Sequence, residues 1–285
     1  MARIIAVANQ KGGVGKTTTA VNLAAALAAA RRKVLLVDLD PQGNATMASG
    51  VNKRDATPNL CAVLLEEVPV GAAIVTTAAH FDLLPGGPDL TAAELKLMDA
   101  LAREHRLKEQ LTHIAGNYDT ILIDCPPSLN LLTLNALTAA DGVLIPVQCE
   151  YFALEGLSSL LETVKAVRHR LNPRLQIEGL LRTMYDVRNN LGNEVSAQLT
   201  QHFGDKVLRS IIPRNVRLAE APSFGQPIHL YDRSSRGAIA YIGLAGEMIR
   251  RERTAHAAGA TAIPHPPTHD EPGVVLKAPA ANHQE

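Results

Sequence analysis

The sequence contains no tryptophan, and aromatic residues occupy only 3% of its 285 positions. The core must therefore be built mainly from Ala, Leu, Val and Ile, a composition that suits helices packed on a parallel sheet. Net charge is also lacking, because Lys plus Arg and Asp plus Glu each total 28. A neutral chain does not by itself indicate nucleic acid or membrane as a partner. Any binding to a polyanion must therefore come from a local group of basic residues.

Cysteine and long apolar segments are equally scarce. Cys61, Cys125 and Cys149 are widely spaced and form no CxxC pair, which favours reduced thiols over a disulfide framework. No apolar run reaches the roughly 20 residues that span a bilayer. The first ten residues, MARIIAVANQ, lead directly into a glycine-rich loop and do not resemble a signal peptide. We therefore expect a cytoplasmic protein that does not bind a membrane.

Short aliphatic segments alternate with longer segments rich in Ala and Leu. The short segments predict buried strands at residues 3–8, 33–37, 120–123, 142–147 and 177–181. The long segments predict helices at residues 17–30, 92–113, 129–140, 155–171, 194–203 and 234–253. This alternation predicts an α/β fold with a doubly wound, mainly parallel sheet flanked by helices.

The composition changes after residue 253. Residues 254–285 contain five prolines among Ala, His and Gly, and they show no apolar period. Such a segment cannot bury enough apolar surface to offset the entropy lost on ordering. The sequence therefore predicts one domain at residues 1–253 and a disordered Pro/Ala/His-rich tail at residues 254–285.

A glycine-rich loop, NQKGGVGKTT at residues 9–18, follows the first predicted strand and opens the first predicted helix. This context is typical of a P-loop, in which backbone N–H groups and the helix N-terminus surround phosphate oxygens. Lys16 would contact the β- and γ-phosphates, and the Thr17 hydroxyl would bind Mg²⁺. The other expected nucleotide contacts are Lys11, Gly12, Gly13, Val14, Gly15 and Thr18. Gln10 stands where the ordinary motif has glycine, so the loop is a variant with a second lysine.

Two of the predicted strands are followed by carboxylates. Asp38 and Asp40 lie in DLDPQGN after residues 34–37, and Asp124 lies in DCPPS after residues 120–123. The carboxyl ends of parallel strands meet at the crevice where ligands bind. Each motif alone could also be a turn or a buried strand with a capping aspartate. Because both motifs lie downstream of the loop, we favour the interpretation that their carboxylates belong to the binding site.

Together these motifs resemble those of the ParA/MinD ATPases, a branch of the P-loop NTPases with a deviant Walker A motif, here KGGVGKTT. The resemblance runs from residue 3 to about residue 250, and VQCEYFALEG, TMYD and IPRNVRLAEAPSFG make it closest to chromosomal, Soj-type ParA proteins. It implies ATP and Mg²⁺ as cofactors and an ATPase that is slow without DNA and a partner. It also implies an ATP-dependent homodimer, in which Lys11 reaches the nucleotide of the partner subunit and takes part in catalysis alongside Lys16.

The resemblance also implies roles for the other site residues. Asp40 would orient or activate the attacking water, while Asp124 would hold a Mg²⁺-bound water. Asp38 would act nearby, through the water shell of the metal. Pro213 and Asn215 would lie against the adenine.

Two arginines match DNA-binding positions of the family, namely Arg188 after TMYD and Arg217 in NVRL. Their role would be phosphate neutralisation without base readout. Further basic candidates are Arg233, Arg236 and Arg250. Each of these arginines could equally be an ordinary solvated charge.

A protein of this family would segregate chromosomes or plasmids. Its ATP-bound dimer would coat nucleoid DNA non-specifically, and a ParB-type centromere-binding partner would stimulate hydrolysis and release it. Several alternatives stay open: a related ATPase that positions a protein cargo on the nucleoid, a metabolic ATP-dependent enzyme on the same scaffold, and a non-hydrolysing DNA scaffold. A MinD-like membrane ATPase is disfavoured, because residues 254–285 lack the pattern of a basic amphipathic helix.

Overall fold

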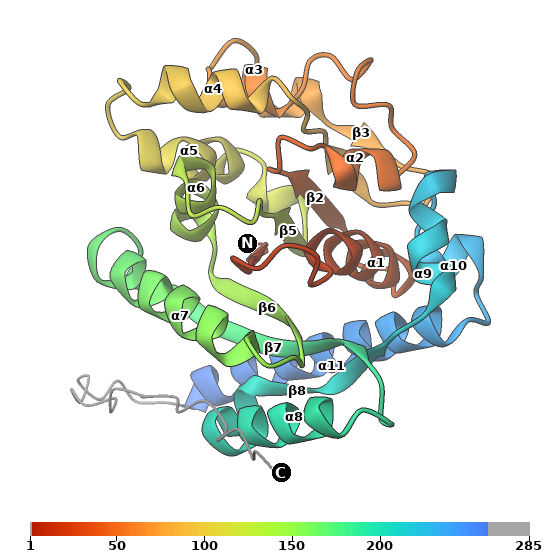
Figure 1. Ribbon diagram of the computed structural model, residues 1–285. Helices are drawn as coiled ribbons and strands as arrows, with labels where there is room; N and C mark the ends of the chain where they lie inside the picture. Colours follow the sequence, from red (N-terminus) through yellow and green to blue (C-terminus); the bar gives the residue numbers. More distant parts are fainter. Residues whose placement is uncertain (1, 262–285) are drawn as a thin grey trace, which may run out of the picture.

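Eight strands form a single sheet in the order β3-β4-β2-β5-β1-β6-β7-β8 (Figure 1). The computed structural model describes residues 2–261, so most of the expected tail, residues 262–285, lies outside the described residues. In chain order the strands are β1 (Arg3–Val7), β2 (Val34–Asp38), β3 (Val75–Thr76), β4 (Asp82–Leu84), β5 (Thr120–Asp124), β6 (Gly142–Gln148), β7 (Gln176–Tyr185) and β8 (Val207–Pro213). Neighbouring strands run parallel except β3 and β4, which are antiparallel.

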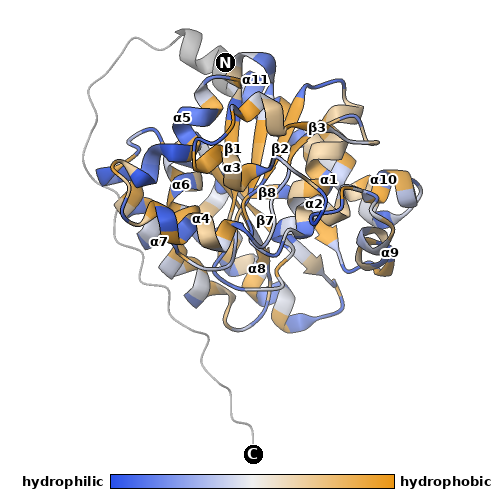
Figure 2. Cartoon of the chain, turned by 90° about the horizontal axis from the view of Figure 1, so that it is seen from above, coloured by the Kyte–Doolittle hydropathy of each residue, from blue (hydrophilic) through white to orange (hydrophobic). Residues whose placement is uncertain are grey.

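The central strands are aliphatic because both faces of the sheet are covered. Every residue of β2 and β5 is buried. Leu35 and Val37 of β2 point into one hydrophobic core, whereas Leu36 points into a second core on the opposite face. Figure 2 shows these hydrophobic strands at the centre of the molecule and hydrophilic segments mainly at its periphery. The predicted doubly wound α/β fold is confirmed.

Helices cover the two faces in separate groups. The helices are α1 (Lys16–Ala29), α2 (Asn44–Ala48), α3 (Leu60–Leu64), α4 (Leu90–Leu97), α5 (Arg106–Thr112), α6 (Leu131–Ala139), α7 (Ala153–Arg170), α8 (Asn190–Phe203), α9 (Val216–Glu220), α10 (Ile228–Tyr231) and α11 (Arg236–Thr261). Buried side chains of α3 to α8 belong to the first core, and those of α1, α2 and α9 to α11 belong to the second. Among the described residues, no helix is long and apolar enough to cross a membrane.

Two predicted helices differ from the observed ones. The helix expected at residues 92–113 is divided: α4 ends at Leu97, α5 begins at Arg106, and Ala102 between them has a φ of 52°. An alanine in the left-handed region cannot continue a right-handed helix. Leu101 beside it is 90% exposed, so the apolar period is also lost here. Helix α11 runs on to Thr261, past the expected end at residue 253.

Three strands were not predicted from the sequence, namely β3, β4 and β8. Strands β3 and β4 are only two and three residues long, too short to show a period. Strand β8 lies at the edge of the sheet, and its sequence VLRSIIP includes an exposed arginine and a partly exposed serine. An edge strand does not need the continuous aliphatic run that marks the buried strands.

Candidate active site

The loop between β1 and α1 is an open cradle made of glycine. Gly13 and Gly15 have φ values of 74° and 88°, which glycine adopts without steric cost. A Cβ added to Gly12 or Gly13 would meet nothing within 4 Å. Gly15 is the N-cap of α1 and offers no side chain to the first N–H groups of the helix, whose first turn also lacks acidic residues. These N–H groups and the positive end of the helix dipole form a site for an anion.

Side chains from distant parts of the chain hold this loop in place. Asn9 is buried; its Nδ2 donates to the Pro146 carbonyl at 2.7 Å and its Oδ1 accepts from the Lys11 N–H at 3.0 Å. Thr183 Oγ1 donates to the Val14 carbonyl at 2.8 Å. Strands β6 and β7 therefore anchor the loop, while its glycines stay accessible. Neither Asn9 nor Thr183 was predicted as a site residue, because their partners lie far away in sequence.

The two lysines of the loop lie in different environments. Lys16 is 7% exposed, and its Nζ donates to the Lys11 carbonyl at 3.2 Å. Burial lowers the pKa of Lys16, while the nearby carboxylates of Asp124 and Asp40 oppose this shift. The Lys11 side chain is 36% exposed, and its Nζ pairs with Glu150 Oε2 at 2.9 Å. The charge of Lys16 thus faces the interior of the site, whereas Lys11 reaches over its outer surface.

Asp38 and Asp124 end adjacent parallel strands and lie side by side in register. Both are fully buried. Asp38 Oδ2 accepts hydrogen bonds from the Thr46 N–H and hydroxyl, each at 2.7 Å. Burial raises the pKa of Asp38 to about 6. Its Oδ2 is therefore bound to the N-terminal turn of α2, whereas its Oδ1 accepts only a long hydrogen bond, at 3.4 Å, from the Asp40 N–H.

Asp124 differs from its neighbour because neither of its oxygens accepts a hydrogen bond of normal geometry within the described part of the chain. Burial and the adjacent charge of Asp38 raise the pKa of Asp124 well above its ordinary value, against the smaller opposing effects of Thr17 and Lys16. A buried carboxylate whose oxygens accept no hydrogen bond of normal geometry is costly, and a divalent cation would relieve that cost. No group of three His, Cys, Asp or Glu side chains within residues 2–261 could hold a metal by itself. This suits Mg²⁺, which takes one or two protein ligands and completes its shell with phosphates and water.

Asp40 lies at the start of the turn between β2 and α2. It is 8% exposed, and its Oδ1 accepts from the Gln42 N–H at 2.9 Å. The Gly43 N–H donates to the Asp40 carbonyl at 2.8 Å, and Gly43, with a φ of 60°, caps α2. The influence of Asp40 on the pKa of Lys16 places its carboxylate near the cradle.

The ends of β7 and β8 close the other side of the cradle. Pro213 pairs with Tyr185 across these strands, and Asn215 Oδ1 caps α9 by accepting from the Leu218 N–H at 3.2 Å. Met184, at the end of β7, approaches the cradle, since a Cβ added to Gly15 would lie 3.8 Å from its Cε. Pro213 and Asn215 therefore follow a strand whose neighbour contacts the P-loop.

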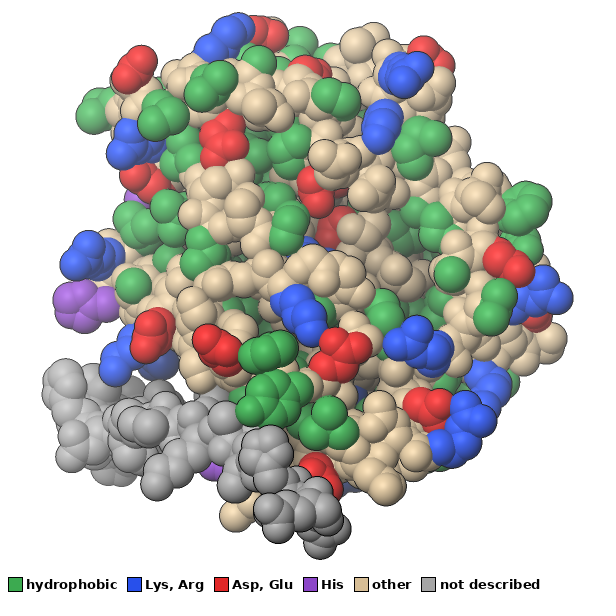
Figure 3. Space-filling view, in the orientation of Figure 1, with side chains coloured by type: hydrophobic (Ala, Val, Ile, Leu, Met, Phe, Trp, Pro, Cys, Tyr) green, Lys and Arg blue, Asp and Glu red, His purple; other side chains and the backbone are tan. Residues whose placement is uncertain are grey.

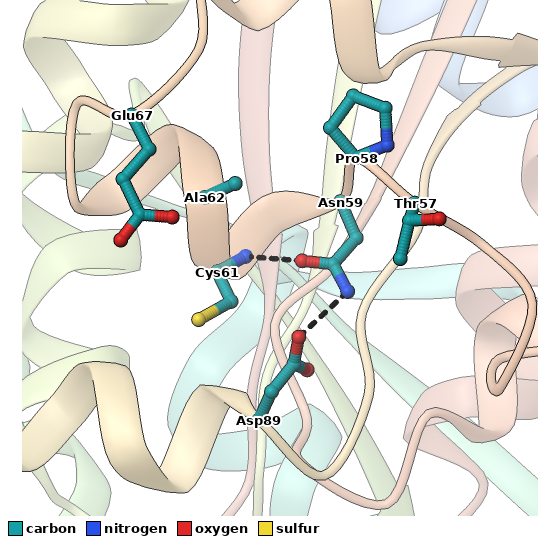
Figure 4. Close-up of a pocket in the computed structure, with 7 residues that line it drawn as sticks. All are labelled: Thr57, Pro58, Asn59, Cys61, Ala62, Glu67 and Asp89. Carbon is teal, nitrogen blue, oxygen red and sulfur yellow. Dashed lines mark hydrogen bonds between the residues drawn. The ribbon is translucent and has the colours of Figure 1, made fainter.

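Two cavities lie near this edge of the sheet. One of about 130 Å³ borders Glu150, Met184 and Arg214, beside the P-loop. A larger one of about 450 Å³ lies between the starts of α3 and α4, where Asn59 and Asp89 face each other (Figure 4). There Asn59 Nδ2 donates to Asp89 Oδ2 at 2.7 Å. The larger cavity includes no residue of the P-loop, so size alone does not mark the nucleotide site.

The two predicted DNA-contacting arginines are exposed and paired with acidic neighbours. Arg188 bonds to Asp186 at 2.7 Å, and these bonds hold the pKa of Asp186 well below its usual range. Arg217 pairs with Glu220 at 2.8 Å. Figure 3 shows basic side chains along the edge of the molecule near α9 and α10, interleaved with acidic ones. The other candidates, Arg233, Arg236 and Arg250, are exposed as well.

Comparison with known proteins identifies the family. A family profile described as an AAA domain matches residues 2–177. The sporulation initiation inhibitor protein Soj of Bacillus subtilis is 55% identical over 87% of this chain and 98% of its own length. The chromosome partitioning protein ParA of Caulobacter vibrioides is 51% identical over 90% of this chain and 98% of its own length. The chain belongs to the ParA/Soj family of P-loop ATPases. This ParA/Soj ATPase also resembles a solved structure, cobyrinic acid a,c-diamide synthase from Mycobacterium smegmatis with bound ADP and magnesium, with a TM-score of 0.79, 40% identity and coverage of 90% of this chain and 97% of that one.

Proposed function

We propose that this ATPase is a dimerising switch that partitions chromosomes or plasmids. The observation that carries the proposal is the division between the two lysines of the P-loop. Lys16 is buried in the cradle, where it can serve a nucleotide bound to its own subunit. Lys11 lies outside, partly exposed and paired with Glu150, where a second subunit could receive it. Hydrolysis that needs Lys11 from a partner couples the state of the nucleotide to the oligomeric state.

The substrate is ATP, bound as its complex with Mg²⁺. The N–H groups of the loop and Lys16 hold the phosphates, and Pro213 and Asn215 border the adenine. Thr17 and Asp124 would hold Mg²⁺, which neutralises charge on the phosphates when bound. The unpartnered oxygens of Asp124 support this assignment, and Asp38, already bonded to Thr46, acts through the water shell.

Asp40 and Lys11 act on the reaction itself. Asp40 orients the attacking water as it leaves its bond to the Gln42 N–H. Lys11 from the partner subunit neutralises charge that develops during phosphoryl transfer, the role that an arginine finger has in other NTPases. Loss of such a group reduces turnover by roughly 10³-fold or more.

Non-specific double-stranded DNA is the surface on which the dimer acts. Arg188 and Arg217 are exposed; Arg188 pairs with Asp186, and Arg217 pairs with Glu220 and Asp232. Solvent-exposed ion pairs contribute little and exchange readily, so both arginines are available to DNA phosphates. A dimer presents two such sets to one duplex and gains affinity through effective concentration. The protein would then associate with the nucleoid until a ParB-type partner stimulates hydrolysis and releases it.

The deciding experiment is a DNA-binding assay at several salt concentrations, with and without ATP and Mg²⁺. We expect the wild-type protein to bind DNA only with ATP, with an affinity that falls steeply with salt. Lys16→Ala should not bind under any of these conditions. Lys11→Ala should bind ATP without hydrolysing it, and Asp40→Ala should stay on DNA after the wild type has been released. Binding that ignores ATP would contradict the switch.

Matched charge reversals test the DNA surface. Arg188→Glu and Arg217→Glu should weaken retention on DNA without impairing ATP-dependent dimerisation. Arg174→Glu is the control, because Arg174 is also exposed but precedes β7, at the opposite edge of the sheet from Arg188. Equal losses in all three variants would indicate a general effect of charge and would argue against this surface.

A metabolic ATP-dependent reaction is the second candidate, favoured by the likeness to the Mycobacterium smegmatis synthase. ATP turnover that is fast without DNA and requires a small-molecule acceptor would favour it. A cargo other than DNA, carried along the nucleoid, keeps the same switch and would be identified by the partner that stimulates hydrolysis.

A further inference from the structure

The turn that carries Asp40 is a short, polar connection between β2 and α2. Its internal hydrogen bonds are those from the Gln42 N–H to Asp40 Oδ1 and from the Gly43 N–H to the Asp40 carbonyl. The first of these uses the carboxylate itself. If Asp40 turns towards a water molecule, the turn loses that bond at the moment when its position matters most.

Lys53 contacts this turn from the segment between α2 and α3. Its Nζ donates a hydrogen bond to the Gln42 carbonyl. Gln42 is therefore held on both sides, because its N–H bonds to Asp40 and its carbonyl accepts from Lys53. Only the second contact persists when the Asp40 carboxylate reorients.

The aliphatic stem of Lys53 fixes the same place by packing. A Cβ built on Gly43 would lie 2.7 Å from Lys53 Cδ and 3.3 Å from Lys53 Cβ, so the stem lies directly against this glycine. A Cβ on Gly87 would lie 3.4 Å from the Lys53 carbonyl, which seats the backbone of Lys53 against the loop that follows β4. Lys53 is thus supported at its backbone, packed along its stem and bonded at its ammonium group.

We infer that Lys53 is a positioning residue for ATP hydrolysis, acting by holding the turn at residues 40–43 while Asp40 engages the attacking water. The inference rests on the proposed role of Asp40. Lys53 donates to a backbone carbonyl of the turn and does not itself touch the phosphate cradle in any described hydrogen bond. Its loss should therefore lower kcat and leave ATP affinity unchanged. Displacements of about 1 Å at a reacting group can reduce rates by up to roughly 100-fold, and we expect a fall of about tenfold for loss of this one contact.

The test compares Lys53→Met, which keeps an apolar stem but loses the ammonium donor, with Lys53→Arg, which keeps a cation. Lys33→Met is the control, since Lys33 is an exposed lysine that precedes the other end of β2. Steady-state ATPase kinetics in the presence of DNA would give kcat and KM, and a fluorescent ATP analogue would give the affinity. Hydrogen–deuterium exchange would follow the amides of residues 40–48 in the nucleotide-free protein.

We expect Lys53→Met to lose about tenfold in kcat with its ATP affinity within about twofold of wild type. Its amides at residues 40–48 should exchange faster, and Lys53→Arg should recover most of the rate. A wild-type kcat or unchanged exchange in Lys53→Met would overturn the inference, and so would a matching loss of ATP affinity and thermal stability. Asp40→Ala separates the two proposals. If that variant hydrolyses ATP normally, the role of Asp40 fails, whereas normal hydrolysis in Lys53→Met alone removes only the role of Lys53.

Discussion

Glu150 holds Lys11 in the described conformation, so removing the charge of Glu150 should favour ATP-dependent dimerisation. In the proposed symmetric dimer, each subunit would have to release Lys11 from Glu150 before the lysine could reach the partner's nucleotide. The pair is partly exposed, at 36% for Lys11 and 47% for Glu150. An ion pair in such surroundings typically contributes about 0.2–1 kcal/mol. Two pairs break per dimer, so their release costs at most about 2 kcal/mol, which corresponds to about 30-fold in the dissociation constant.

Glu150→Gln keeps the size of the side chain and removes its charge. We expect the dimer formed with Mg²⁺ and a non-hydrolysable ATP analogue to become tighter by about 2- to 30-fold. Sedimentation velocity over a concentration series would measure this constant. Glu109→Gln, a change at an exposed glutamate on α5, is the control and should have no effect.

An unchanged dissociation constant would refute the idea that Lys11 must leave Glu150. A weaker dimer would refute it more directly, because it would mean that the carboxylate of Glu150 contributes to the interface. Neither result would touch the proposed role of Lys16, which can be measured in the isolated subunit by ATP binding.

Further predictions concern the stability of the fold. Glu247→Ala should destabilise the protein by about 1.5–3 kcal/mol and lower Tm by about 3–12 °C in calorimetry, because the carboxylate accepts from two backbone N–H groups of β8. Burial alone would raise the pKa of Glu247, but these hydrogen bonds lower it. The stability that the Glu247 carboxylate contributes should be complete above its ordinary pKa and should be lost as the pH falls through the lowered pKa. The stabilities of wild type and Glu247→Gln should therefore converge in acid. Gly225→Ala should cost more in urea unfolding than Gly204→Ala, since both have positive φ but only at Gly225 would a Cβ lie 2.9 Å from Gly50 Cα. Equal losses of unfolding free energy in the two variants would mean that backbone strain alone, and not the contact with Gly50, destabilises Gly225→Ala.

The central strands could be predicted from the sequence because buried strands consist mainly of aliphatic residues. Strands β2 and β5 are buried at every position and aliphatic except at Asp38, Thr120 and Asp124, and such runs stand out between polar turns. Strand β8 has no such requirement, since it lies at the edge of the sheet and several of its side chains are exposed or only partly buried. The break at Ala102 was equally hidden, because a left-handed alanine has no signature in sequence.

In the candidate site, too, some features could be predicted from the sequence and others could not. The P-loop and the aspartates at the strand ends are local patterns, and the structure brings Lys16, Asp38, Asp40 and Asp124 to one edge of the sheet. Their partners could not be predicted, because each comes from a different segment of the chain. The contact between Lys11 and Glu150 joins residues 139 positions apart. Contacts over such separations follow from topology, which no single motif contains.

The charges around the cradle also bear on the form in which ATP enters it. Two buried carboxylates, those of Asp40 and Asp124, act on the buried ammonium group of Lys16, and a third, that of Asp38, lies in register with Asp124. An ATP molecule alone would add further negative charge to this arrangement. We therefore expect binding to need a cation that arrives with the phosphates, for which Asp124 is the proposed carboxylate. We expect affinity for ATP to fall sharply when Mg²⁺ is chelated and to recover in part in Asp124→Asn, where the repulsion is reduced. If Asp124→Asn bound ATP no better than wild type without Mg²⁺, electrostatic repulsion by this carboxylate would not be what makes the site depend on the metal.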